Sequence, residues 1–373
     1  MPKLLFISGT IGNGLSGGSM IGRRNLNFVR QIGSGSIQVT ALCTGRTVAN
    51  PELNVETVSA YYSPAQTLLA ALCLKTGGLT KKSEDKIRQL ISDHHFDVLF
   101  LDSSLLGNIA KIAKDTRPKI KVISYFHNVE LEYALERCRI ESLKFSALIP
   151  AIYYAERASV KYSDIIVGIS DRDSNLLWDK YRRSFDEIIP VSLPDRFAPN
   201  KLQKVKPRTV LFVGSDFYAN VHGLNWLVRE VMCDQSIDIR LEVVGSGLEK
   251  YRSTFSRANI DIIGKVSNID DYYYQANAVI MPIFSGSGMK VKTAEALSFG
   301  RHVIGSTEAF IGYDVDRLDA RLCTSADDFK TALADIGNIP DNGFSSTNRR
   351  SFELNYSDEQ SFKTFSNLFK KVI

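Results

Sequence analysis

The stretch from Pro282 to Gly300 (PIFSGSGMKVKTAEALSFG) combines residue types that can hold an anion against the main chain. An apolar run ends at Pro282, a turn containing Gly286 and Gly288 follows, and a helix is predicted to open around Met289. Glycine lets a ligand approach the backbone closely, and the free N–H groups of a helix start carry positive partial charge. This arrangement favours binding of a diphosphate.

Three charged residues in the same helix bear on that prediction. Lys290 and Lys292 place cations at the positive end of the helix dipole, which they oppose, so a bound anion explains them better than helix stability does. Glu295 lies further along, where its carboxylate could accept hydrogen bonds from ribose hydroxyls. An ordinary surface pair of Lys292 and Glu295 at i,i+3 is the alternative, and the residues alone leave both open.

A second candidate is His127, which follows the predicted strand Lys121–Tyr125 at its carboxyl end. It could act in an active site or simply bond to neighbouring backbone. Asn128 and Glu130 are better explained as caps of the next helix than as catalytic groups. His222 could line a cleft from a turn, or cap a helix.

Other patterns favour structural or weaker explanations. Tyr272–Tyr274 are more typical of a helix packed on a sheet than of sugar stacking. Gly12, Gly14 and Gly17 match G-x-G-x-x-G, a pattern of dinucleotide-binding turns. The acidic residue that holds the ribose in such sites is missing, because the sequence has no Asp or Glu before Glu52. A dinucleotide site is therefore disfavoured.

Short apolar runs that alternate with helical stretches must position these residues. Such continuous apolar runs are typical of parallel strands covered by helices on both faces. We therefore predict an α/β fold of two doubly wound parallel sheets, whose ligands lie beyond the carboxyl ends of the strands. The predicted strands are Lys3–Ser8, Ile37–Leu42, Val98–Leu101, Lys121–Tyr125, Ile165–Ile169, Ile188–Val191, Val210–Val213, Arg240–Val244, Asp261–Ile263, Ala278–Pro282 and His302–Ile304.

The domain boundaries follow from one proline-rich segment. Leu193–Pro207 carries three prolines and four basic residues without a sustained period, which indicates a linker. We predict a first domain over residues 1–197 and a second over residues 208–350. A helix at 357–373, with Phe362, Phe365 and Phe369 near helical spacing, is predicted to pack back on the first domain.

Composition narrows the class of protein. The chain has 373 residues, 44% of them hydrophobic and 23% charged, as in globular two-domain proteins. A net charge of +5 without a dense basic stripe argues against nucleic acid as a partner. Five scattered cysteines suit a reducing compartment, and we expect a cytoplasmic location, with the inner face of the membrane as the alternative. Phe145–Ala155 is the stretch nearest to a membrane span; a core helix is preferred, and a surface that rests on a membrane is the alternative.

The segment GSGMKVKTAEAL resembles the donor-binding turn of retaining glycosyltransferases of the GT-B fold, specifically glycosyltransferase family 4 (group 1). The resemblance spans most of the chain. It is supported in order by weaker matches at Gly17–Gly18, His127–Glu130, Leu211–Val221 with Leu224–Val228, Ile262–Val266 and Ile269–Ala278.

This resemblance implies a GT-B fold, in which two Rossmann-like domains face each other across a cleft, and it assigns roles to residues. His127, near the transferred sugar, and Lys292, which neutralises the departing nucleotide together with Lys290, would be the catalytic groups. Glu295 would hold the ribose. Gly17 and Gly18 would let the acceptor approach. The remaining donor-binding residues would be Gly214, Gly264, Val266, Ser287, Gly288 and Met289.

The chain departs from the family pattern at two places. Ser287 stands where many members carry the first of two glutamates, which grips sugar hydroxyls, so the donor sugar stays open. Ser215 and Asp216 follow Gly214 where many members have Arg and Lys, which leaves the diphosphate charge to Lys290 and Lys292.

The function that follows is retaining transfer of a sugar from a nucleoside-diphosphate sugar, with UDP favoured over GDP. The acceptor would be a glycan or lipid-linked molecule of bacterial polysaccharide or glycoconjugate synthesis, with peripheral membrane contact. No cofactor and no obligatory metal are expected, because lysines and a helix start can carry the diphosphate charge. The alternatives are a non-catalytic GT-B partner subunit and a GT-B-like epimerase or phosphorylase.

Overall fold

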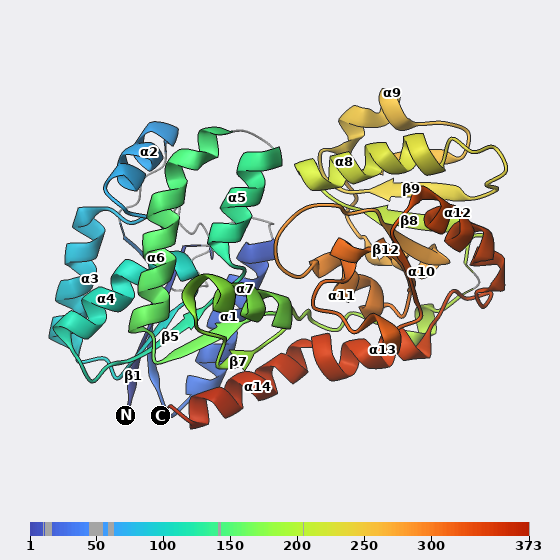
Figure 1. Cartoon of the computed structure of the whole chain (residues 1–373). Coiled ribbons are helices and arrows are strands. Elements are labelled where there is room, and N and C mark those ends of the chain that lie inside the picture. Colours follow the sequence, from blue (N-terminus) through green and yellow to red (C-terminus); the bar gives the residue numbers. More distant parts are fainter. Residues whose placement is uncertain are drawn as a thin grey trace. The chain divides into compact units, whose positions relative to one another are not determined.

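The computed structural model describes residues 1–9, 11, 17–44, 55–58, 63–140, 143–203 and 205–372. Its contacts divide the chain into two compact units (Figure 1). The first consists of Met1–Pro190 together with Phe362–Ile373, and the second of Val191–Ser361.

The first unit is built on a parallel sheet in the order β3-β2-β1-β4-β5-β6-β7. The chain moves outward from β1 in one direction, then returns to β4 beside β1 and continues the other way. The carboxyl ends of β1 and β4 therefore form the topological switch point of this sheet. The strands are β1 (Lys3–Ser8), β2 (Gln38–Cys43), β3 (Glu56–Thr57), β4 (Val98–Leu101), β5 (Lys121–Tyr125), β6 (Ile165–Gly168) and β7 (Glu187–Ile188).

Helices cover this sheet and bury its apolar strands. The core includes Leu5, Ile7, Leu99 and Leu101, all fully buried. The helices are α1 (Gly17–Gly33), α2 (Pro64–Leu72), α3 (Lys81–His94), α4 (Gly107–Thr116), α5 (Glu130–Ile140), α6 (Ile149–Tyr162) and α7 (Asp171–Tyr181).

The last helix, α14 (Asp358–Lys370), begins in the second unit and ends in the first. Its aromatic residues pack against the first sheet, with the Phe369 ring centroid 6.2 Å from that of Phe100. Phe365 is also fully buried, and its ring lies edge-on to Phe28 of α1 at 5.6 Å. The helical spacing of these phenylalanines thus places one apolar face on the core.

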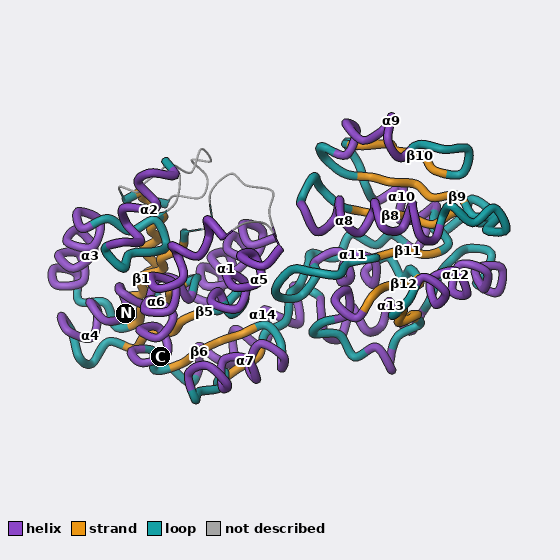
Figure 2. Tube along the Cα trace, turned by 45° about the horizontal axis from the view of Figure 1, so that its top comes forward, coloured by secondary structure: helices purple, strands orange, loops and turns teal. Residues whose placement is uncertain are grey.

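The second unit repeats the same scheme, with a parallel sheet in the order β10-β9-β8-β11-β12-β13. Its switch point lies at the carboxyl ends of β8 and β11. Figure 2 shows the helices of each unit arranged around its strands. The strands are β8 (Thr209–Val213), β9 (Arg240–Val244), β10 (Ile260–Gly264), β11 (Ala278–Met281), β12 (His302–Ser306) and β13 (Ala320–Cys323).

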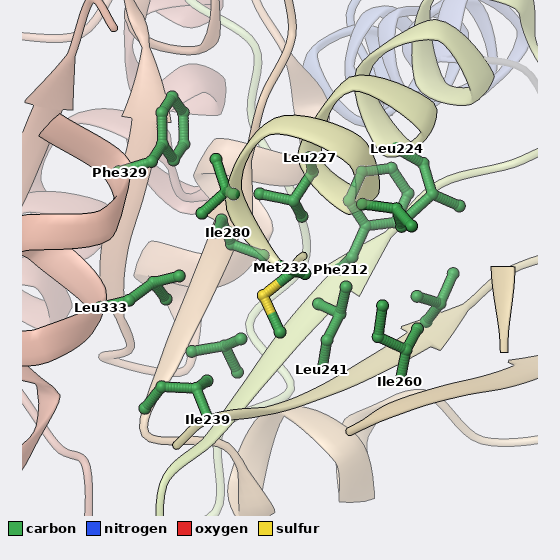
Figure 3. Close-up of a cluster of buried hydrophobic side chains, with 14 of the residues drawn as sticks. Phe212, Leu224, Leu227, Met232, Ile239, Leu241, Ile260, Ile280, Phe329 and Leu333 are labelled. Atoms are coloured by element: carbon green, nitrogen blue, oxygen red, sulfur yellow. The ribbon is translucent and has the colours of Figure 1, made fainter. Parts of the chain in front are cut away.

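The core of the second unit gathers side chains from strands and helices, as Figure 3 shows for Phe212, Leu227, Ile280 and Phe329. All four are at most 1% exposed. The helices are α8 (Tyr218–Trp226), α9 (Arg252–Phe255), α10 (Asp270–Gln275), α11 (Val291–Ser298), α12 (Ala326–Ala334) and α13 (Ser346–Ser351).

The predicted fold class is confirmed, and β1, β4, β5 and β9 have the predicted bounds. Two edge strands, β3 and β13, were missed because they are short and largely exposed or half-buried rather than continuously apolar. The helix predicted around Met289 begins at Val291. The core helix preferred for Phe145–Ala155 is divided between a 3₁₀ turn (Leu143–Leu148) and the start of α6. In the described part of the chain, no helix has the length and apolar character needed to cross a membrane.

Candidate functional site

Close backbone packing at the end of β8 shapes the switch point of the second unit. A Cβ on Gly214 would lie 2.9 Å from the Cγ atom of Asn220, and one on Gly245 would lie 1.5 Å from the Gly214 carbonyl oxygen. A Cβ on Gly223 of α8 would similarly lie 1.9 Å from the Pro282 carbonyl oxygen. Glycine at these positions lets α8 and the segment after β11 approach each other, which brings Asn220 close to α11.

The turn between β11 and α11 needs glycine for its conformation. Gly286 has φ +114° and Gly288 has φ +64°, both in the region that other residues rarely adopt. Ser287 between them is half-buried. Met289 is 6% exposed and packs where a Cβ on Gly312 would lie, at 2.4 Å from its Cγ. The turn is therefore fixed by its backbone and by one buried side chain.

Lys290 stabilises this turn. Its ammonium donates to the Gly286 carbonyl at 3.2 Å and to the Gly288 carbonyl at 2.9 Å, and it pairs with Glu308 Oε1 at 3.2 Å. Its main-chain oxygen accepts from the hydroxyl of Tyr313 at 2.9 Å. Lys290 is the residue before α11 rather than a member of its first turn. Its role on a diphosphate stays a prediction.

Lys292 lies in the first turn of α11, and its positive charge faces a neutral hydrogen-bond partner. Its Nζ atom donates to Asn220 Oδ1 at 2.5 Å and lies 5.6 Å from the ring centroid of Phe212. No described carboxylate lies within ion-pair distance of it. Burial, with the charge of Lys290, lowers the pKa of Lys292 to about 7, against the opposing effect of Glu295. An anion bound here would stabilise the charged form of Lys292.

Glu295 is already engaged by two donors. Oε1 accepts from Arg196 Nη2 at 2.7 Å, and Oε2 accepts from the Tyr273 hydroxyl at 2.8 Å. Arg196 also pairs with Asp270 Oδ1 at 3.3 Å. A carboxylate has about four acceptor positions, so a ribose hydroxyl could still bond to Glu295 alongside these donors.

Two of these partners were not identified from the sequence as part of the site. Arg196 belongs to the segment predicted as a linker, which carries no motif. Tyr273 is fully buried and stacks on Phe299 at 4.9 Å, which confirms the packing predicted for the tyrosine run while adding its bond to Glu295. Only the apolar context of the tyrosine run could have indicated its burial.

The other predicted donor residues lie at the end of β10 or nearby. Gly264 has φ +83°, and a Cβ there would lie 3.0 Å from the Cβ of Glu249. Val266 is half-buried two residues later. His222 lies inside α8 rather than in a turn, with its ring edge-on to Phe284 at 6.1 Å. The donor-binding role of Gly264 and Val266 stays a prediction.

The switch point of the first unit holds a buried carboxylate. Asp102 follows β4 directly and is fully buried. Ser8, the last residue of β1, donates to Asp102 Oδ2 at 2.7 Å, and Asn25 of α1 donates to Oδ1 at 2.8 Å. His127 Nε2 lies 3.1 Å from the Asp102 carbonyl oxygen and 3.2 Å from Oδ1. Residues from β1, α1, β4 and the end of β5 thus converge on one acid.

The same cluster extends to Arg24 and Tyr125. Arg24 Nη2 donates to Asn25 Oδ1 at 2.8 Å and to the Tyr125 hydroxyl at 3.1 Å. The Tyr125 ring meets that of His127 edge-on at 5.1 Å. Sequence reasoning named only His127 of these residues. The position of Asp102 directly after a buried strand was the signal that could have found it.

One ring nitrogen of His127, Nε2, faces acceptors of Asp102, and the other, Nδ1, lacks a hydrogen-bond partner among the described residues. Nδ1 is buried, and the same is true of Asn128 Oδ1, which also lacks a partner among these residues. Burial lowers the pKa of His127, but the charge of Asp102, its hydrogen bonds and the charge of Glu130 together raise it above the usual value.

The start of α5 is capped by a residue from another helix. Glu156 of α6 is fully buried and accepts from the main-chain N–H groups of Glu130 at 2.7 Å and Leu131 at 3.3 Å, and from the Tyr181 hydroxyl at 2.9 Å. The prediction that Asn128 caps this helix is wrong, because Glu156 takes the free donors. Burial raises the pKa of Glu130 and of Glu156 to about 7, and the charge of Glu156 adds to the rise at Glu130.

The remaining predictions for the first unit concern glycines. Gly17 and Gly18 open α1, and a Cβ on Gly18 would meet nothing within 4 Å. Their role in acceptor approach stays a prediction. Gly12 and Gly14 lie outside the described residues. Among the described residues, no group of three or more His, Cys, Asp or Glu could hold a metal ion.

Comparison with solved structures decides the fold. The lipopolysaccharide outer core galactosyltransferase WaaB, in its apo form, aligns with a TM-score of 0.67 at 15% identity and covers 100% of both chains. HepE of Anabaena, solved with UDP and glucose, aligns with a TM-score of 0.67 at 11% identity, also over 100% of both chains. The fold is GT-B.

Sequence comparison finds a family match within the second unit. Residues 207–336 match the sequence model of the family described as glycosyl transferases group 1. An uncharacterized glycosyltransferase of Haemophilus influenzae is 26% identical over 154 residues, or 39% of this chain. That match spans only 42% of the relative's length. The family match includes Gly214, Gly264, Val266 and the whole segment from the glycine turn to Glu295.

Proposed function

We propose that this chain is a glycosyltransferase that moves a sugar from a nucleoside-diphosphate sugar to a glycan or lipid-linked acceptor in bacterial glycan synthesis, with retention of configuration. The family match over residues 207–336 and the GT-B fold support the class of reaction. Donor chemistry, acceptor and stereochemistry belong to the proposal.

The observation that carries the proposal is the surplus of positive charge at the start of α11. Lys292 is bonded to a neutral amide oxygen, that of Asn220, in a place where burial disfavours its charge. It lies at the positive end of a helix dipole, beside a glycine turn. A diphosphate would neutralise the ammonium and accept hydrogen bonds from the helix start.

In the proposed reaction, Lys292 stabilises the charge that develops on the departing nucleoside diphosphate, the largest contribution in such transfers. The sugar carbon would pass through an oxocarbenium-like transition state, as at other glycosidic centres. His127, the proposed catalytic group of the first unit, would meet the transferred sugar through its open Nδ1 atom. Glu295 would hold the ribose.

UDP is the preferred nucleotide of the proposal. HepE, which shares the fold, was solved with UDP, UDP-glucose and UDP with glucose. In this chain, Ser287 is a neutral residue beside the phosphate-binding turn, so recognition of the sugar must rely on other groups. In this proposal the lysines and the helix start carry the diphosphate charge, and no metal ion is required.

Thermal stabilisation by nucleotides tests the proposal without knowledge of the acceptor. Ligand binding to the native state alone raises the unfolding midpoint. UDP should raise it, GDP should raise it less, and NAD, CMP and pyridoxal phosphate should leave it unchanged. If no nucleoside diphosphate raises the midpoint at millimolar concentration, the donor site is not functional and the alternative of a non-catalytic partner subunit is favoured.

Membrane contact is the part of the proposal that concerns the acceptor, and α2 supports it. Ala65, Leu68, Leu69 and Leu72 follow helical spacing and all point to solvent, with Leu69 68% and Leu72 71% exposed. From Val58 to Ser83 the chain has no Asp or Glu but has Lys81 and Lys82, together with Lys75, which pairs with Glu84. An apolar helical stripe with nearby cations suits the surface of an anionic bilayer.

Vesicle co-sedimentation tests this contact. The protein should sediment with phosphatidylglycerol vesicles and much less with phosphatidylcholine vesicles. A double change, Leu69→Ser with Leu72→Ser, should remove the binding, whereas Leu354→Ser, which changes a leucine 54% exposed in the second unit, should leave it intact. Equal sedimentation of both variants would contradict the assignment of α2, as would absence of binding by the unaltered protein.

A further inference from the structure

Asp102 is bonded in a way that determines the orientation of His127. Its carboxylate accepts from Ser8 Oγ at 2.7 Å and from Asn25 Nδ2 at 2.8 Å, so its position is fixed from β1 and α1. Asp102 then presents two acceptors to the same imidazole nitrogen, its Oδ1 atom at 3.2 Å and its main-chain oxygen at 3.1 Å from His127 Nε2. Because the Asp102 carboxylate is fully buried, bulk water does not compete with these side chains for its oxygen atoms.

These two acceptors set the proton pattern of the ring. Because both groups that face Nε2 accept hydrogen bonds, Nε2 must carry a proton. In neutral His127 the remaining nitrogen, Nδ1, is therefore an acceptor, and in the charged form it becomes a donor. Nδ1 is buried and has no partner among the described residues, so it is the atom left to meet a substrate.

We propose that Asp102 is a positioning residue of the transfer reaction: it fixes the proton of His127 on Nε2 and so leaves Nδ1 as the ring nitrogen that acts on the substrate. In the neutral form, Nδ1 would accept from a sugar hydroxyl. In the charged form, it would donate to an oxygen of the sugar-linked phosphate. The inference rests on the proposed function, since a role for Nδ1 requires a sugar donor.

The charged and titratable groups around His127 come from several elements, and the two carboxylates among them favour its charged form. Asp102 after β4 and Glu130 of α5 both raise its pKa, whereas burial lowers it. Tyr125 of β5 meets the ring edge-on, and its hydroxyl is bonded to Arg24 of α1. Asp102 is the group in direct contact with the ring nitrogen, so its charge should contribute the largest single share of the rise.

The first measurement needs no substitution and no activity. In protein labelled with ¹⁵N-histidine, the ring nitrogen shifts of His127 report its tautomer and its pKa, and the His127→Gln variant assigns its signals among the five histidines. The inference predicts the Nε2–H tautomer at pH values above the pKa. A neutral ring protonated on Nδ1 would overturn it, whether or not the chain transfers sugars.

Asp102→Asn then tests the charge. This change keeps the size of the side chain and the main-chain acceptor but removes an opposite charge next to the ring, which should lower the pKa of His127 by about one unit or more. Asp164→Asn is the control, because Asp164 is likewise a hydrogen-bonded acid of the first unit, which accepts from the Val122 main-chain N–H and pairs with Lys114, but it lies at the amino ends of β5 and β6. That control should leave the pKa of His127 unchanged. An unaltered pKa in Asp102→Asn would overturn the inference.

The pH profile of kcat connects the ring to the reaction. If the charged form assists departure of the phosphate, kcat falls as pH rises through the pKa of His127, and this limb should move to lower pH in Asp102→Asn by the same amount as the NMR pKa. A limb that stays in place while the NMR pKa moves would overturn the role of Asp102 in catalysis. Absence of transfer by the unaltered protein, together with the predicted tautomer, would instead refute the proposed function.

Discussion

The two switch points have the same position in their sheets but opposite electrostatics. In the first unit, the buried Asp102 is balanced within the protein by Ser8, Asn25 and His127. In the second unit, Lys292 donates to the amide oxygen of Asn220, no described carboxylate lies within ion-pair distance of it, and burial with the charge of Lys290 lowers its pKa to about 7. The first site balances its buried carboxylate within the protein, whereas the second would gain stability from a bound anion.

This difference indicates a division of labour. A cluster that satisfies its own charges holds one side chain, His127, in a fixed orientation, as a group that acts on a reacting centre requires. A cation that the protein does not neutralise provides favourable binding energy for a negatively charged ligand, and for charge that grows on a leaving group.

Replacement of Lys292 should have the largest effect. Lys292→Met keeps the apolar stem of the side chain and removes the charge opposite the departing diphosphate, so kcat should fall by about 10²–10³-fold, the usual consequence of losing one such group. Lys330→Met, which removes a lysine paired with Asp234, is the control and should retain turnover. Unchanged turnover in Lys292→Met would remove this residue from the mechanism and with it the contrast between the switch points.

Replacement of Glu295 should have a smaller effect, on binding. Glu295→Gln weakens a charged acceptor for ribose hydroxyls, and hydrogen bonds to charged groups contribute about 1.5–3 kcal/mol, so the Kd for UDP should rise about tenfold or more. Titration calorimetry measures this directly. Arg196→Gln frees Oε1 and should leave UDP binding equal or tighter. If Glu295→Gln binds UDP as well as the unaltered protein does, Glu295 serves only to hold Arg196 and Tyr273.

The pH dependence of UDP binding tests the charge of Lys292. Its pKa is about 7 without ligand, and a bound diphosphate would favour the protonated form, so affinity should be lost as pH rises above 7. The protonated fraction falls from about one half to about one tenth between pH 7 and 8, which predicts about a fivefold rise in Kd. Titration of the UDP phosphate affects the unaltered protein and Lys292→Met alike. The additional pH dependence of Kd that comes from Lys292 should be absent from Lys292→Met. Equal slopes in both proteins would show that Lys292 does not face the ligand.

Sequence reasoning found the second switch point more completely than the first, for a physical reason. The glycine turn, Lys292 and Glu295 lie within ten residues, so local spacing carried their relation. In the other cluster, Asp102 contacts Ser8, Asn25 and His127, which lie far apart in the sequence. Only the folded sheet brings these four residues together. The strands were found because buried parallel strands read as apolar runs, and β3 and β13 were missed because their residues are mostly exposed or half-buried and form no such run.

Partners supplied from a distance explain the remaining differences. Arg196 reaches Glu295 from the segment between the sheets, and Glu156 reaches the start of α5 from α6. Neither has a local signature, since Glu156 lies in the middle of an ordinary amphipathic helix. The sequence suggested Asn128 as the cap because caps are usually adjacent residues, and the buried Glu156 took that place instead.

The smallest expected effect concerns stability and the acids near His127. The folded-state pKa of Glu130 is raised from 4.5 to about 7, so the folded protein holds more protons than the unfolded chain between these values. Stability of the first unit should therefore fall as pH rises from about 4.5 to 7. Glu130→Gln removes part of this penalty, so its Tm should exceed that of the unaltered protein by about 2–4 °C at pH 8 and not at pH 4.5.

Glu132→Gln, on the same helix and paired with Lys180, is the control and should show no gain at pH 8. The result also bears on the comparison of the two units. If Glu130→Gln is less stable at pH 8, the acid is stabilised in its charged form, and the first switch point includes a larger charge network than Asp102 and His127. If the gain appears, Glu130 is a cost that the fold tolerates beside His127, which benefits from the negative charge.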